Sequence, residues 1–137
     1  GEAIEAMIRF WNKVDEENGI KPENRKPIKI YINSGGGELY ATFTIIDAIK
    51  MSKTPVYTIN IGNAYSGGFF IFISGHKRLA YTKSTFLYHE GAKGGMRQDP
   101  NKFDNFASFY KKQLEILKDI TLQNTKIGEE LYEIGEV

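Results

Sequence analysis

The chain has 137 residues, a length typical of one domain built around a single hydrophobic core. Its 18 Lys and Arg residues nearly balance 17 Asp and Glu residues, and a net charge of +1 gives no electrostatic case for binding nucleic acid. The absence of cysteine excludes disulfides, thiolate metal sites and a cysteine nucleophile, and it suits a reducing, cytoplasmic location.

An amphipathic helix is predicted at the start of the chain. Its apolar residues recur at helical spacing between charged ones and are Ile4, Met7, Ile8, Trp11 and Val14. Residues 1–5 are acidic, whereas a secretory signal begins with basic residues. No apolar run reaches the roughly 18 residues needed to cross a bilayer. We therefore expect neither a secretory signal nor a membrane partner.

Residues 28–61 show the pattern of a strand, a helix and a second strand. The strands are predicted at 28–32 and 56–61, and the helix between them begins at Glu38 and ends before Pro55. Such a βαβ unit implies a parallel sheet. Glycine-rich corners at 35–37 and 62–68 each follow a strand, so both are expected at the carboxyl edge of the sheet, where α/β proteins usually place their sites.

The second corner carries Ser66, directly before Gly67 and Gly68. A buried helix is predicted after it, ending at Gly75. The unpaired amides at such a helix start can stabilise a developing oxyanion. Taken alone, however, the motif also fits an ordinary turn with a serine cap.

Two short strands are predicted next, at 78–81 and 85–88, and His89 stands at the end of the second. A flexible polar loop over 90–100 and a long amphipathic helix over 102–125 follow. That helix would be roughly 36 Å long, so it either overhangs the domain to meet a partner or lies flat across the sheet. The other histidine, His76, lies in a polar turn and is expected to be exposed.

A serine at a helix start, a histidine at a strand end and two glycine corners form the set that acyl transfer requires. The α/β-hydrolase order demands an acid between serine and histidine. No Asp or Glu lies between Ser66 and His89, so that layout is disfavoured.

Three segments taken together, residues 31–37 (YINSGGG), 61–69 (IGNAYSGGF) and 86–89 (FLYH), resemble the ClpP peptidase family in motif, order and approximate spacing. The resemblance runs over essentially the whole chain. It implies an α/β fold of the ClpP/crotonase type, with stacked ββα units, a largely parallel sheet and a long protruding helix. We expect one peptidase domain over residues 1–137, incomplete or disordered at both ends.

The resemblance implies a role for each matching residue. Ser66 corresponds to the nucleophile and His89 to the general base of a serine endopeptidase. Gly37 and Gly67 correspond to the oxyanion amides, and the positions that border the substrate are Gly36, Leu39, Gly94 and Gly95. The substrate would be a peptide or unfolded protein, hydrolysed inside two face-to-face heptameric rings and delivered by an AAA+ unfoldase. No cofactor and no metal are expected.

The chain departs from the family pattern at three places. Gly35 stands where the family has proline, so the corner lacks a fixed φ. Glu90-Gly91 replaces the family's Gln-Pro and puts a carboxylate next to His89, where it either raises the pKa of the histidine or points to solvent. By spacing, the family's triad aspartate falls one or two positions beyond Val137.

Three alternatives remain open. Residues 65–70 also look like signal peptide peptidase A, a relative with a lysine base, for which Lys83 or Lys93 would serve. A second alternative is a non-catalytic scaffold, assembled with an active partner or associated with a phage capsid. The third is an acyl-CoA enzyme of the crotonase type, which shares the oxyanion arrangement.

Overall fold

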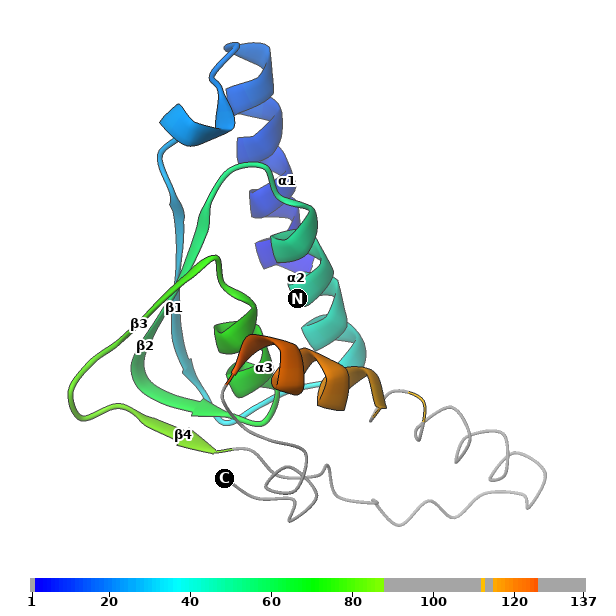
Figure 1. Ribbon diagram of the computed structural model, residues 1–137, viewed down its shortest axis with the longest axis vertical. Coiled ribbons are helices and arrows are strands. Elements are labelled where there is room, and N and C mark those ends of the chain that lie inside the picture. The colour runs from blue at the N-terminus through cyan, green and yellow to red at the C-terminus, as the bar shows by residue number, and fades with distance from the viewer. Residues whose placement is uncertain (1, 88–111, 113–114, 126–137) are drawn as a thin grey trace. The chain divides into compact units, whose positions relative to one another are not determined.

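The computed structural model describes residues 2–87, 112 and 115–125, shown as coloured ribbon in Figure 1. The chain divides into two compact units, residues 1–87 and 88–137, and each is considered by itself. The single-domain organisation therefore stays a prediction. Eight elements make up the first unit: α1 (Glu2–Glu17), a 3₁₀ turn (Pro22–Asn24), β1 (Ile28–Ser34), α2 (Leu39–Met51), β2 (Val56–Tyr65), α3 (Gly67–Ser74), β3 (Lys77–Ala80) and β4 (Thr85–Leu87).

The four strands form one sheet in which every pairing is parallel. β1 pairs with one edge of β2, whereas β3 and β4 pair one after the other with its opposite edge. Figure 1 shows the three helices on the same side of this sheet. The predicted α/β class with a parallel sheet is confirmed.

The core lies between β1, β2 and the helices. One cluster of its buried residues consists of Ile8, Ile45, Ile49 and Val56, with Ile28 and Ile30 packed against them. The register places Ile28 beside Val56, so alternate residues of both strands point toward the helices. Ile49 and Val56 are fully buried, and each such side chain stabilises the fold by about 1.5–3 kcal/mol.

The predicted apolar stripe of α1 is only partly used inside this unit. Ile8 is buried and Ile4 packs against the core, but Met7 and Trp11 are exposed, with Phe10 between them in sequence. Trp11 packs edge-on against Phe10 at 5.3 Å between ring centroids. Within this unit, the part of the predicted stripe that reaches the core is therefore Ile4 and Ile8.

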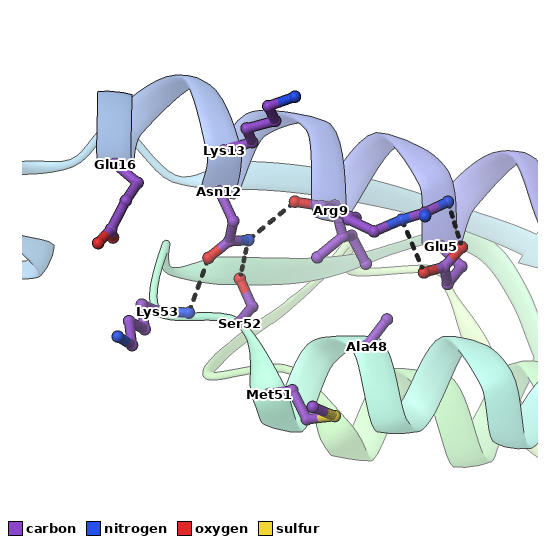
Figure 2. A pocket seen from close by; sticks show the side chains of 10 residues that line it. Glu5, Arg9, Asn12, Lys13, Glu16, Ala48, Met51, Ser52 and Lys53 are labelled. Atoms are coloured by element: carbon purple, nitrogen blue, oxygen red, sulfur yellow. Dashed lines mark hydrogen bonds and ion pairs between the residues drawn. The ribbon is translucent and has the colours of Figure 1, made fainter. Parts of the chain in front are cut away.

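Asn12 joins α1 to the end of α2 (Figure 2). Its Oδ1 atom accepts hydrogen bonds from the backbone amides of Lys53 (2.9 Å) and Thr54 (3.1 Å). Its Nδ2 group donates to the carbonyl of Ile8 (2.8 Å) and to Ser52 Oγ (2.7 Å). One side chain thus forms hydrogen bonds with two backbone amides and one hydroxyl of the loop that connects α2 to β2.

His76 is exposed, as predicted, but both nitrogens of its ring bind the backbone. Nδ1 accepts a hydrogen bond from the Val56 amide at 3.0 Å. Nε2 lies 3.0 Å from the Ile49 carbonyl, so it carries the ring hydrogen and donates to that oxygen. His76 therefore joins the last turn of α2 to the first residue of β2.

β2 continues to Tyr65, four residues beyond the predicted end. Between the pairs Ile32 with Asn60 and Ser34 with Ala64, β2 advances farther than β1, which marks a bulge. Two asparagine side chains brace it. Asn33 Oδ1 accepts from the Asn63 amide and Asn60 Oδ1 accepts from the Gly62 amide, both at 3.1 Å. Residues 62–65 of the predicted glycine corner therefore belong to β2, and the turn itself begins after Tyr65.

Residues 112 and 115–125 of the second unit are helical up to Asn124, within the predicted range 102–125. Thr121 donates from its hydroxyl to the Leu117 carbonyl at 2.9 Å, a bond inside the helix. The earlier part of the predicted helix lies outside the described residues, so its length and role stay predictions. Over the described ranges, none of the helices has the length and apolar character needed to cross a membrane.

Candidate active site

Ser66 has an unusual backbone conformation. Its dihedral angles are φ 50° and ψ −115°, and no other non-glycine residue in the described part of the chain has a positive φ. Such a conformation costs of order 1–3 kcal/mol and persists only where the surrounding structure holds it. Ser66 joins the last residue of β2 to the first residue of α3, so the backbone makes a sharp turn between a strand and a helix.

The side chain of Ser66 does not act as a helix cap. Although Ser66 occupies the N-cap position of α3, its hydroxyl makes no capping hydrogen bond to that helix. Its backbone carbonyl accepts from the Phe70 amide at 3.2 Å, which is the first hydrogen bond of the helix. The interpretation of this serine as an ordinary cap is therefore wrong.

The two glycine corners meet at Ser66, as the sequence predicted. A Cβ placed on Gly36 would lie 3.1 Å from Ser66 Cβ and 3.5 Å from its Oγ, and Gly36 has a φ of +118° that favours glycine. A Cβ placed on Gly67 would lie 3.3 Å from the Gly37 nitrogen. The structure thus brings Gly36, Gly37, Ser66 and Gly67 together.

The side chain of Ser34 forms a hydrogen bond inside the first glycine corner, residues 35–37. Its Oγ accepts a hydrogen bond from the Gly36 amide at 3.1 Å, which forms a local serine turn. Gly35, which stands where the family has proline, does not fix the backbone angle φ. The bond between Ser34 and Gly36 constrains the backbone on either side of it instead. Leu39, half-buried, begins α2 just after the corner.

Thr42 lies directly behind the two corners. It is 3% exposed, its hydroxyl donates to the Glu38 carbonyl at 3.0 Å, and a Cβ on Gly67 would approach that hydroxyl to 2.7 Å. Thr42, Gly37 and Gly67 also line a pocket of about 300 Å³ with Ile30, Ile32 and Ile45. A side chain at position 67 would therefore require Thr42 to shift.

β4 is anchored at its far end to the serine itself. The Ser66 amide donates a hydrogen bond of 2.8 Å to the Leu87 carbonyl, and Leu87 pairs with Tyr65. The strand that leads to His89 in the sequence therefore ends beside the strand that leads to Ser66.

Four predicted residues lie outside the described part of the chain: His89, the two loop glycines Gly94 and Gly95, and the alternative base Lys93. Lys83 is described, and it is exposed in the turn that precedes β4. Three further residues of this region were not predicted from the sequence: Thr42, and the pair Asn60 and Thr85, in which Asn60 Nδ2 donates to the Thr85 carbonyl at 2.9 Å. Asn60 gave a recognisable signal, because a polar residue in a buried apolar strand requires a partner.

Comparisons with known proteins give the family. The model of the Clp protease family matches residues 20–133. The ATP-dependent Clp protease proteolytic subunit of Deinococcus radiodurans is 34% identical over 105 residues, which are 75% of this chain and 51% of that protein. Proteolytic subunit 2 of the ATP-dependent Clp protease from Treponema pallidum (strain Nichols) is 38% identical over 71 residues, 50% of this chain and 36% of the relative.

A third relative, the same subunit 2 from Prochlorococcus marinus (strain MIT 9312), is 43% identical over 70 residues, 50% of this chain and 34% of that protein. The matches thus span about half or less of the length of these curated relatives. The parallel sheet, with a strained serine at the carboxyl edge of β2, places the chain in the class of α/β proteins. Within that class, the chain belongs to the Clp protease family.

Proposed function

We propose that this protein is a serine peptidase that hydrolyses peptide bonds, with Ser66 as nucleophile and His89 as general base. The amides of Gly37 and Gly67 are the proposed oxyanion donors. Gly36, Leu39, Gly94 and Gly95 are the proposed contacts of the substrate main chain. The names of the relatives, which describe proteolytic subunits of an ATP-dependent protease, agree with this proposal.

The observation that carries the proposal is the conformation of Ser66. A serine with a φ of 50° is strained, and its hydroxyl does not cap the helix that follows. Two glycine corners adjoin it, so a substrate carbonyl can approach backbone amides without meeting a Cβ. This arrangement supports a nucleophile beside an oxyanion site better than it supports a structural turn.

The position of β4 supports His89 as the base. His89 follows Leu87 by two residues, a separation that an extended chain spans over about 7 Å at most. The Leu87 carbonyl accepts a hydrogen bond from the Ser66 amide, so β4, the strand that precedes His89 in the sequence, ends beside the candidate nucleophile. Lys83 stands at the opposite end of β4, four residues before Leu87, which disfavours it as the base.

The proposed reaction has two stages. Ser66 Oγ gives its proton to His89 and attacks the scissile carbonyl carbon, while the amides of Gly37 and Gly67 stabilise the negative oxygen. His89 then protonates the leaving amine as the C–N bond breaks, and water hydrolyses the acyl-enzyme. Removing one oxyanion donor from such a site slows kcat by about 10²–10³-fold.

Substitution of the candidate bases separates the alternatives. His89→Ala is expected to abolish hydrolysis of a fluorogenic peptide, whereas Lys83→Ala and Lys93→Ala are expected to retain it. Activity that survives His89→Ala but not a lysine variant would support the Ser-Lys mechanism. Turnover of a short acyl-CoA, with none of the peptide, would support the crotonase alternative. No turnover of either, with Ser66 unreactive, would support the scaffold.

The second part of the proposal concerns assembly and supply. We expect a homo-oligomer of paired heptameric rings, fed with unfolded protein by an AAA+ unfoldase. The exposed face of the sheet supports a protein partner. Tyr31, Ile59 and Leu79 form one row across β1, β2 and β3; Tyr31 and Leu79 are 57% and 44% exposed, whereas Ile59 between them is buried at 5%.

Sedimentation velocity tests the assembly. The wild-type protein is expected to sediment as a large oligomer, and Tyr31→Glu and Leu79→Glu to lower its mass without unfolding it. Met51→Glu is the control, because Met51 is 83% exposed outside this row. A monomeric wild type would contradict the ring proposal while leaving the peptidase chemistry to the kinetic test.

A further inference from the structure

The edge of β2 that pairs with β3 and β4 contains an interruption. Asn60 of β2 pairs with Ala80, the last residue of β3, whereas Asn63 pairs with Thr85, the first residue of β4. β2 therefore advances three residues while the neighbouring segment advances five. The regular backbone pairing of β2 with β3 therefore does not continue into its pairing with β4. Backbone pairing with β3 alone does not fix the register of β4 on β2.

Asn60 bridges this interruption. The residue is fully buried, and its Nδ2 group donates to the Thr85 carbonyl at 2.9 Å. Its Oδ1 atom accepts from the Gly62 amide at 3.1 Å. The side chain thus supplies, in the gap, a bond from β2 to the first residue of β4 and a second bond that shapes the bulge of β2.

The exposed side chain of Thr85 also links the start of β4 to β2. Its hydroxyl donates to Asn63 Oδ1 at 2.8 Å, and it lies 3.0 Å from the Tyr65 hydroxyl. Since the threonine has one hydroxyl hydrogen, Tyr65 donates to Thr85. Both partners belong to the last three residues of β2, and Tyr65 immediately precedes Ser66.

We propose that Asn60 and Thr85 are positioning residues for the proposed serine–histidine pair, because they fix the register of β4 on β2. This inference rests on the proposed function. β4 has only three residues, and a slip of one residue would move it by about 3.3 Å and turn its side chains to the other face. A misplacement of about 1 Å can already cost 100-fold in rate, so the register determines the activity.

Thr85→Val is the direct test, because it keeps the shape of the side chain and the backbone carbonyl but removes the hydroxyl. We expect kcat for peptide hydrolysis to fall by about tenfold or more, with KM and melting temperature close to wild type. Thr85→Ser restores the hydroxyl and is expected to recover most of kcat. Thr44→Val is the matched control, since the exposed Thr44 bonds only within α2, to the Tyr40 carbonyl at 2.8 Å.

Tyr65→Phe tests the network from its other end. It is expected to lower kcat by a smaller factor, and combining it with Thr85→Val should cost less than the product of the two single effects. The pH dependence of kcat/KM should change in Thr85→Val but not in Thr44→Val. If Thr85→Val folds poorly, Thr85→Ser and Tyr65→Phe still decide the matter, because the proposal requires Tyr65→Phe to slow turnover and Thr85→Ser to preserve it.

The result that would overturn the inference is a Thr85→Val variant, or failing it a Tyr65→Phe variant, with kcat and pH profile within twofold of wild type. Failure of the proposed function has a different signature: wild type and His89→Ala would then hydrolyse the peptide equally well, or neither would hydrolyse it.

Discussion

The backbone amide of Ser66 donates a 2.8 Å hydrogen bond to the carbonyl of Leu87. This bond joins the ends of two parallel strands, β2 and β4, at the point where each leaves the described sheet. The residue that follows β2 is the candidate nucleophile, and the candidate base comes two residues after β4. Much of the proposed chemistry therefore depends on how these two strand ends are held together.

Gly67→Ala is expected to damage the proposed oxyanion site. The new Cβ would meet Thr42 Oγ1 at 2.7 Å and the Gly37 nitrogen at 3.3 Å, so Thr42 must shift and the proposed oxyanion amides are pushed apart by a few tenths of an ångström. We expect kcat to fall by about 100-fold, the cost of losing one oxyanion donor. Steady-state kinetics checks this, and adding Thr42→Ala should recover part of the loss by making room.

Gly35→Ala is the control for that substitution, because no atom lies within 4 Å of its Cβ. Its kcat is expected to match wild type. Normal turnover by Gly67→Ala, or an equal loss in Gly35→Ala, would contradict the geometry assigned to these amides.

Gly37→Ala separates an effect on the substrate from an effect on the fold. The free protein has open space at this Cβ, with nothing within 4 Å, so we expect the free energy of unfolding to change by less than about 0.5 kcal/mol. The methyl group would still obstruct a carbonyl approaching the amide, so kcat/KM should fall. Thermal melts and kinetics on one preparation check both parts; an unchanged kcat/KM would argue against Gly37 as a donor.

Asn12→Ala should destabilise the fold without touching the site. It leaves the amides of Lys53 and Thr54 without their acceptor and removes two donated bonds, at a cost of about 1–3 kcal/mol. Asn12→Asp keeps the acceptor and should cost less. Urea denaturation measures the difference in stability. Equal midpoints for the two variants would show that the hydrogen bonds from the Lys53 and Thr54 amides to Asn12 do not stabilise the fold.

His76→Ala and His89→Ala are expected to have opposite effects. His76 bonds the Val56 amide and the Ile49 carbonyl, so its loss should lower stability by about 1–3 kcal/mol and leave kcat unchanged well below the melting temperature. His89→Ala should abolish turnover. A His76→Ala variant that melts like wild type, or that loses turnover while folded, would contradict the structural role.

The sequence was sufficient to predict the βαβ unit and the meeting of the two glycine corners. Apolar runs such as 28–32 end abruptly at glycine, and the handedness of parallel crossovers leaves little choice about where the corners lie. The same reasoning ended β2 too early, because Ile61-Gly62-Asn63 has the composition of a turn. Two side chains instead hold those residues in a bulged strand: Asn33, which is distant in the sequence, and Asn60, which lies two residues before Gly62.

The sequence points to the candidate site, but it does not show how the residues of that site contact one another. Ser66 and the glycines could be recognised because their chemistry is local. The absence of a capping bond from Ser66, the buried Thr42 behind Gly67 and the role of Thr85 depend on which strands become neighbours. Such contacts carry no periodic signal in a single sequence, so they required the structure.

Labelling by a fluorophosphonate probe tests the central claim most directly. The probe forms a covalent bond with an activated serine, so the wild-type protein should be labelled once per chain, at the peptide that contains Ser66. Ser66→Ala should not be labelled, whereas Ser34→Ala should still react. Equal labelling of wild type and Ser66→Ala would contradict the assignment of Ser66 as the nucleophile.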